Sequence, residues 1–330
     1  MRQVPGGRWG LVWLCTLAIA GGSMIGLEKF VRSRGFVPSV KDDEYSWALA
    51  RRQASNELPH TLAVLGASRI LLAFSPQAFR AALPDWTFVQ LAKQGSFPLA
   101  TLRDLAFDPA FRGVALVDIV ESGFDMWNWD SQVPLVETFH RGWRSVGPLA
   151  ERRLETAVQS RVALLSGDGL RTIRSLVLEG RWPTPFYTTT FADRTKFADY
   201  KMTDVERRRL KQVARIEAYT GEVDDPNTWL ANALTHELYV WLIQSRGGQV
   251  VYLRMPTCDE RWAVDESKWP KAQFWDRFAK VTRAATIHFK DHPALAGFEC
   301  PDTSHIASKD GPQFTHAVLE ILRERGVFQR

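Results

Sequence analysis

The sequence contains few of the features from which metal sites and nucleic-acid interfaces are built. It has three cysteines in 330 residues, and no spacing of its cysteines and histidines is typical of a zinc site. The net charge is only +5, and no block of Lys and Arg forms a basic stripe. Internal repeats and low-complexity tracts are also absent from the sequence. We therefore expect a globular chain that binds neither a metal ion nor nucleic acid.

Apolar residues, by contrast, are plentiful. They make up 45% of the chain, which suffices for one large domain or two modest ones. The thirteen tryptophans are unusual for this length. Two interpretations of them remain open, namely burial in the core and exposure as platforms for sugar rings.

The N-terminal part predicts a membrane anchor. Trp9 to Leu27 is a run of 19 residues without a charge, with basic residues on both sides. As a helix it would be about 28 Å long, which matches a bilayer core. Ala18-Ile19-Ala20 also fits the cleavage pattern of a signal peptide. Residues 1–30 are thus an anchor or a signal, and we favour the uncleaved anchor because the apolar run continues to Leu27. Residues 31–60 follow as a linker and a leading helix.

Short apolar runs that alternate with helical patterns predict the main domain, residues 61–330. Strands are expected at 62–65, 86–92, 113–120, 249–254 and 285–289. Strands that alternate with helices form βαβ units, so we expect an α/β fold with a doubly wound, mainly parallel five-stranded sheet. Residues 130–245 carry mostly helical patterns and predict a large helical insertion within this domain. Whether 187–191 is a short strand or a loop stays open.

Ser68 follows the first of these strands, in Gly66-Ala67-Ser68-Arg69. Ligands bind at the carboxyl ends of the strands of a parallel sheet, so the hydroxyl lies where a substrate is expected. A serine after a strand often only caps the next helix. Asp302-x-x-His305 favours chemistry instead, because His305 would take the proton of Ser68 while Asp302 orients the imidazole. The backbone N–H groups of Ser68 and Gly95 are candidate donors to an oxyanion.

Three segments of the chain are similar to those of the SGNH/GDSL hydrolase family: Gly66-Ala67-Ser68-Arg69, Gly95 after the second strand, and Asp302-x-x-His305 before the last helix. The helical insertion and the N-terminal anchor resemble the membrane-anchored bacterial branch of that family, which includes the alginate O-acetylation proteins. The resemblance implies an SGNH-like fold and an activity on acyl esters of exported polysaccharides. The family usually has an Asn shortly after the third strand as a third oxyanion donor. Here that strand is followed by Glu121-Ser122-Gly123, and the nearest Asn is Asn128.

Four further residues are candidates for substrate binding. Arg69 and Arg254 lie near strand ends, where each would either bind an anionic sugar or hold a loop through a salt bridge. Trp127 and Trp129 would either stack on a sugar ring or be buried under the insertion.

The cysteines also leave a question open. Cys258 and Cys300 both follow strands of the sheet, so they either form a disulfide or remain two unpaired thiols. Cys15 lies in the apolar N-terminal segment.

From these observations we expect a single-pass inner-membrane protein with its main domain in the periplasm. It would act as a serine esterase or O-acyltransferase on acyl, and specifically acetyl, esters of an exported carbohydrate, with no cofactor. Its partners would be that substrate, the membrane and proteins of polysaccharide synthesis or export. The alternative is a non-catalytic protein of the same fold that binds glycan or serves as a scaffold.

Overall fold

A five-stranded parallel sheet forms the centre of the computed structural model, which describes residues 9–124, 131–141, 146–166, 174–175, 178–180, 184–218 and 223–328. The strands are β1 (Thr61–Leu65), β2 (Thr87–Gln90), β3 (Val114–Asp118), β6 (Gln249–Arg254) and β7 (Ala285–His288). Their order is β2-β1-β3-β6-β7, and every neighbouring pair is parallel. The α/β fold with a five-stranded doubly wound sheet, expected from the sequence, is confirmed. The chain reverses direction along the sheet beside β1, which is the topological position where parallel sheets bind ligands.

Helices cover both faces of the sheet because successive strand residues point to opposite sides. Leu62 and Val64 of β1 belong to one apolar core, and Ala63 and Leu65 belong to the other. The first core contains residues of α3 (Ser68–Ala73), α4 (Pro76–Ala82) and α15 (Gly311–Glu324). The second contains residues of α2 (Glu44–Ala54), α5 (Leu99–Phe107), α10 (Pro226–Leu234), α11 (Glu237–Ser245) and α13 (Trp275–Val281). The elements α12 (Asp259–Lys268), η5 (Phe289–Asp291), α14 (Pro293–Ala296) and η6 (Ser308–Asp310) complete the C-terminal half.

The segment between β3 and β6 is the large, mostly helical insertion that the sequence predicts. In chain order it contains η1 (Glu121–Phe124), α6 (Val133–His140), α7 (Val146–Gln159), η3 (Ala163–Leu165), β4 (Thr188–Thr190), β5 (Lys196–Ala198), η4 (Tyr200–Met202) and α9 (Val205–Glu217), followed by α10 and α11. β4 and β5 pair as an antiparallel hairpin, so the run left open as strand or loop contains a strand. The amide of Ala198 donates to Ser308 Oγ over 2.9 Å, which fixes the hairpin beside the loop that contains His305.

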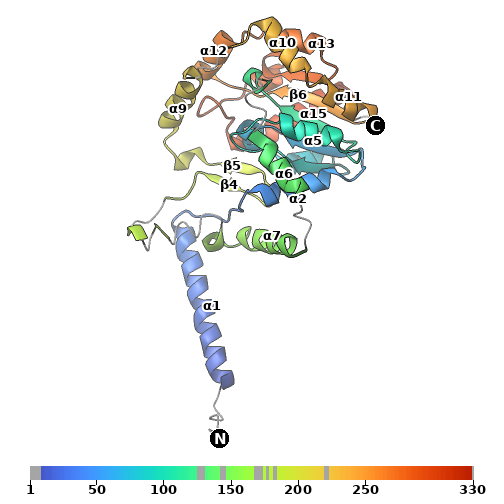
Figure 1. The fold of residues 1–330 in the computed structure, drawn as a ribbon. Coiled ribbons are helices and arrows are strands. Elements are labelled where there is room, and N and C mark those ends of the chain that lie inside the picture. The colour runs from blue at the N-terminus through green and yellow to red at the C-terminus, as the bar shows by residue number, and fades with distance from the viewer. Residues whose placement is uncertain are drawn as a thin grey trace.

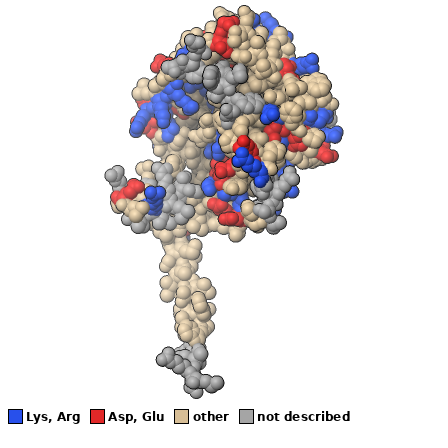
Figure 2. Space-filling model, in the orientation of Figure 1, with Lys and Arg blue, Asp and Glu red and all other residues tan. Residues whose placement is uncertain are grey.

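The N-terminal helix α1 (Trp9–Ser33) projects from the body as a stalk (Figure 1). Among the residues that the structure describes, it is the one helix that is long and apolar enough to cross a membrane. Lys and Arg side chains are absent from most of the described stalk, as the tan surface in Figure 2 shows. Residues near its end contact the body: both Glu28 carboxylate oxygens accept backbone N–H groups of η3, from Ala163 and Leu164, at 2.9 Å.

Cys258 and Cys300 form a disulfide, with their Cα atoms 5.7 Å apart. The sequence left this pairing open. The bridge joins the loop after β6 to the loop that carries Asp302 and His305. Cys15, in α1, is a free and exposed thiol.

Candidate active site

Ser68 is the first residue of α3, directly beyond the end of β1. The turn between them requires glycine at position 66, where φ is +144°. A Cβ atom there would lie 2.7 Å from Cβ of Asp118 and 2.9 Å from a methyl carbon of Ile70. The chain can therefore make this close turn only without a side chain, and the turn leaves the Ser68 hydroxyl at the carboxyl edge of the sheet.

The loop before α15 holds Asp302 and His305 in one tight turn. Asp302 Oδ1 accepts the backbone N–H groups of Ser304 and His305 at 3.1 and 2.9 Å. Thr303, between them, has a left-handed backbone with φ of +66°, which non-glycine residues adopt at a cost. Its carbonyl accepts the amide of Cys258 over 2.9 Å, next to the disulfide. The bridge and this hydrogen bond together hold the strained turn in place.

The two segments meet in a continuous chain of hydrogen bonds. His305 Nε2 lies 2.8 Å from Ser68 Oγ, although the residues are 237 positions apart. His305 Nδ1 lies 2.9 Å from Asp302 Oδ2. A carboxylate, an imidazole and a hydroxyl in this order are the arrangement with which serine hydrolases activate their nucleophile. The structure thus brings together all three residues that the sequence singles out for catalysis.

Asp302 is held in its ionised form. Burial alone would raise the pKa of this carboxyl. The hydrogen bond with the His305 ring, the charge of that ring and the two backbone N–H groups outweigh burial, and the pKa of Asp302 is lowered below its ordinary value. An ionised Asp302 accepts the Nδ1 proton of His305 and leaves Nε2 free to accept the Ser68 proton.

Two of the three candidate oxyanion donors lie in the described residues. The Ser68 amide belongs to the first turn of α3, where amides have no partner within the helix. Gly95 lies in an exposed turn with φ of +74°, and a Cβ there would meet no atom of the described chain within 4 Å. The amide of Lys93 donates to the Gly66 carbonyl over 3.0 Å, which links this turn to the serine turn. Asn128 lies outside the described residues, as do Trp127 and Trp129.

Gln132 connects the two turns and was not recognised from the sequence. It is fully buried, and its amide nitrogen donates to Ser96 Oγ at 3.0 Å and to the Gly66 carbonyl at 3.4 Å. Its amide oxygen accepts the Thr101 hydroxyl. One side chain therefore fixes the turn before Ser68 relative to the turn that contains Gly95. A glutamine in a helical segment carries no sequence signal for this position.

Arg69 and Arg254, the two arginines singled out for substrate binding or for holding a loop, occupy different environments. Arg69 is half-buried next to Ser68, and its Nε donates to the Ser304 carbonyl at 3.2 Å. Burial and the nearby charges of Arg261 and Arg254 lower its pKa to about 10, so it remains a cation. Arg254 is 1% exposed and pairs with Glu121 and with Asp265, each at 2.9 Å.

The predicted contact of Arg254 with substrate is therefore wrong, and the salt-bridge alternative is correct. A guanidinium that is buried and already paired with two carboxylates has no free face for a ligand. Asp118, at the end of β3, belongs to the same charged cluster. Burial raises its pKa, against the opposing charges of Arg69 and Arg254.

Tyr200, from the insertion, lies close to the acid end of the triad. Burial and the charge of the nearby Asp302 raise the pKa of Tyr200, so the phenol stays neutral. The insertion thus covers the side of the triad where the carboxylate is buried.

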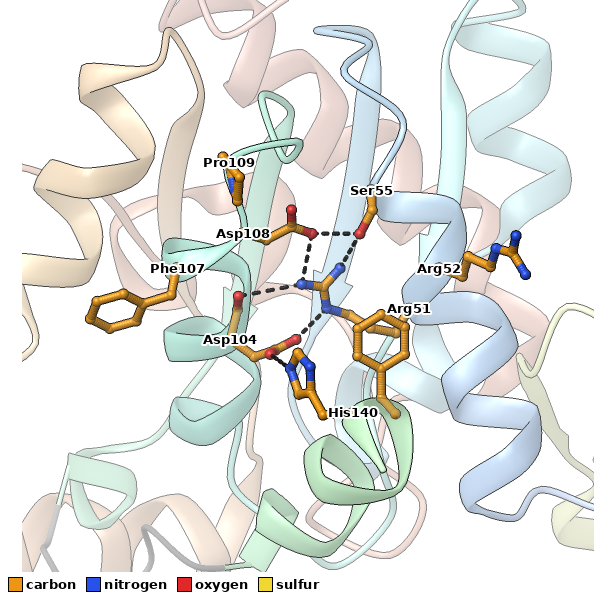
Figure 3. A pocket seen from close by; sticks show the side chains of 9 residues that line it. Arg51, Arg52, Ser55, Asp104, Phe107, Asp108, Pro109 and His140 are labelled. Carbon is orange, nitrogen blue, oxygen red and sulfur yellow. Dashed lines mark hydrogen bonds and ion pairs between the residues drawn. The ribbon is translucent and has the colours of Figure 1, made fainter. Parts of the chain in front are cut away.

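A second polar cluster lines a cavity of about 600 Å³ (Figure 3). His140 Nε2 lies 2.6 Å from Asp104, and Arg51 bridges Asp104 and Asp108 at 2.5 and 3.0 Å. The Ser55 hydroxyl donates to Asp108 over 2.5 Å. Ser55 and Asp108 precede β1 and β3, so this cluster lies at the amino edge of the sheet, opposite Ser68. It ties α2 to α5 and α6 and contributes nothing to the triad.

Comparison with known proteins leaves the family unassigned. No family model matches the chain, and no curated protein matches it. A solved structure titled "Crystal Structure of TesA" aligns with 80% of this chain and 98% of its own, at 12% identity and a TM-score of 0.37. A likeness of this degree carries no functional argument. The structure itself shows a five-stranded parallel sheet whose carboxyl edge carries Ser68, with Asp302 and His305 in hydrogen-bond contact.

Proposed function

We propose that this chain is a membrane-anchored serine esterase or O-acyltransferase that acts on acyl esters, specifically acetyl esters, of an exported carbohydrate. The observation that carries the proposal is the hydrogen-bond chain from Ser68 through His305 to Asp302 at the carboxyl edge of the sheet. The sequence resemblance to membrane-anchored SGNH/GDSL proteins supplies the substrate class.

The reaction follows from the geometry in two halves. Ser68 Oγ attacks the ester carbonyl while His305 Nε2 takes its proton, and the tetrahedral oxyanion accepts the N–H groups of Ser68 and Gly95. The leaving alcohol departs with the proton from His305 and leaves an acyl-serine. In the second half, His305 takes a proton from water or from a carbohydrate hydroxyl, whose oxygen attacks the acyl carbon. The bond between the acyl carbon and Ser68 Oγ then breaks, and His305 returns the proton to Ser68. Water gives hydrolysis and a sugar hydroxyl gives transfer, with the same residues acting in both.

Two observations support a periplasmic location for the main domain. The disulfide between Cys258 and Cys300 is of the kind that persists in oxidising compartments. The helix α1 has the length and composition of an anchor in the inner membrane. The partners we propose are the carbohydrate ester, that membrane and proteins of polysaccharide synthesis or export.

Release of p-nitrophenol from p-nitrophenyl acetate by the full chain in detergent tests the proposal. Wild-type protein should turn over, whereas the Ser68→Ala and His305→Ala variants should fall to the background rate with unchanged melting temperature. Undiminished turnover in Ser68→Ala would rule the mechanism out. A folded wild-type protein that binds glycan without any turnover would favour the non-catalytic scaffold. The sequence argument for the scaffold is the unusual block Glu121-Ser122-Gly123 after the third strand, together with the large insertion.

A further inference from the structure

The outward face of α7 is an unexplained apolar surface. The side chain of Leu154 is 68% exposed, and Ala150 and Ala157, one turn to either side, are exposed as well. These residues follow the spacing that places side chains on one stripe of a helix. Arg153 and Arg161 flank the stripe. The acidic residues of α7 are the exposed Glu151 and the half-buried Glu155, which pairs with Arg152 at 2.8 Å.

The inner face of the same helix contacts the body. Arg152 pairs with Asp43 at 2.7 Å, and Gln159 accepts the amide of Lys41 at 2.9 Å. At 100° per residue, Leu154 lies roughly opposite these two side chains. Leu154 therefore points away from the catalytic body, whereas the exposed Ala157, Arg153 and Arg161 also line the rim of an open hollow between α7 and the body. Figure 1 shows α7 running sideways from the body end of α1, on the side of the body from which α1 projects.

The position of α1 relative to α7 is set by several contacts. Glu28 accepts the two amides of η3, which follows α7, and Arg32 donates to the Arg161 carbonyl at 2.6 Å. Val31 is buried with Ala163 in a small apolar cluster. The anchor thus enters the body beside the end of α7.

The connection from α1 to α2 is likewise held to the body. Val40 donates its amide to the Thr190 carbonyl at 3.0 Å, and the Ser39 hydroxyl accepts the Thr190 amide at 3.0 Å. Phe36 and Val40 are buried. The body is therefore attached closely to its anchor, rather than through a free tether.

We propose that the α7 stripe, defined by Ala150, Leu154 and Ala157, lies on the surface of the membrane that α1 crosses. The structure favours the membrane as the partner of this surface, because a bilayer that surrounds α1 would meet the side of the body on which the stripe lies. Arg153 and Arg161 then meet lipid phosphates at the depth where interfacial helices place their cations. The inference rests on α1 as a membrane span and is independent of the proposed chemistry. Its consequence is that the active site is held at a fixed height above the bilayer.

Fluorescence quenching in reconstituted vesicles tests this placement with three single-thiol labels. The full chain is reconstituted in vesicles of phosphatidylethanolamine and phosphatidylglycerol and carries an environment-sensitive fluorophore. The native Cys15 thiol labels α1 and reports its insertion. Leu154→Cys labels the stripe. Leu238→Cys labels a control position on α11, where the leucine is 51% exposed. Both variants also carry Cys15→Ser, so that each has a single free thiol. Lipids with a nitroxide near the headgroup or deep in the chain serve as quenchers.

We expect deep nitroxides to quench Cys15, shallow nitroxides to quench Leu154→Cys, and neither to quench Leu238→Cys. Adding Arg153→Glu and Arg161→Glu should weaken the quenching at position 154. Quenching of Cys15 without quenching at position 154 would overturn the proposal while leaving the anchor intact. Protection of position 154 from aqueous iodide without lipid quenching would mean that another protein covers the stripe, which also overturns it. An unquenched Cys15 would refute the span and the proposal together.

Discussion

Loss of the Cys258–Cys300 disulfide should lower both the stability of the body and the efficiency of the triad. The bridge closes a loop with a sequence separation of 42 residues. In the chain-entropy model, cross-linking a loop of that length stabilises the fold by about 4 kcal/mol. With an unfolding entropy of about 2.1 cal/mol/K per residue over roughly 300 residues, this corresponds to a decrease in melting temperature of about 6 °C.

The catalytic effect follows from the position of the bridge. Cys300 is two residues before Asp302, and without the bridge the hydrogen bond from the Cys258 amide to the Thr303 carbonyl still joins the two loops but no longer has the disulfide beside it. Small displacements of catalytic groups reduce rates by up to about a hundredfold, so we expect kcat to fall about tenfold or more.

The double variant Cys258→Ala, Cys300→Ala is the clean perturbation, measured by thermal denaturation and by p-nitrophenyl acetate turnover. Cys15→Ser is the matched control, because it removes a thiol from α1 and leaves the body unchanged. Reductant should shift the wild-type protein toward the double variant and leave the double variant unaffected. Equal melting temperatures and equal kcat for the double variant and wild type would refute the reasoning.

Three other predictions test how the site is built. Asp302→Asn should lower kcat by about 10⁴ because the imidazole loses its orienting acceptor. Since the folded chain lowers the pKa of Asp302 below its ordinary 3.8, the ionised carboxylate stabilises the fold fully above that value. In acid titrations the stability difference between wild type and this variant should shrink as the pH falls below 3.8 and be lost once the pH is below the lowered pKa of the folded chain. Gly66→Ala should lower the free energy of unfolding, measured by chemical denaturation, by about 1–3 kcal/mol from overpacking, in addition to the cost of backbone strain. Gly95→Ala, which has open space around it, should lower it by only about 1 kcal/mol. Equal losses of stability in the two variants would contradict the close-contact explanation. Gln132→Ala should lower stability by about 1–3 kcal/mol and reduce kcat/KM, and unchanged kinetics would show that the two turns hold their positions without it.

Much of the fold could be predicted from the sequence because the signals were local. Apolar runs such as Leu62 to Leu65 are short, bounded by turn residues and buried on both faces, which is typical of parallel strands. Ser68, Asp302 and His305 could be identified because the spacing of Asp302 and His305 suits a triad, and because the carboxyl edge of a parallel sheet is where a serine after a strand meets a substrate.

The features that could not be predicted depend on side chains that meet only in the folded protein. Arg254 lies near a strand end as Arg69 does, and only the positions of Glu121 and Asp265 show that it is buried in ion pairs. Gln132 contacts two turns that are 36 and 66 residues away from it in the chain. Cys258 and Cys300 were recognisable as candidates, but sequence spacing gives no distance between their Cα atoms.

Labelling with a fluorophosphonate tests the central claim most directly, because the probe reacts only with a serine whose proton has a base to accept it. Intact mass spectrometry of the full chain in detergent should show one adduct per molecule, and peptide mapping should locate it on Ser68. The adduct should be absent from Ser68→Ala and greatly slowed in His305→Ala. A folded wild-type protein that gains no adduct, or a Ser68→Ala variant that is labelled as fast as wild type, would contradict the account.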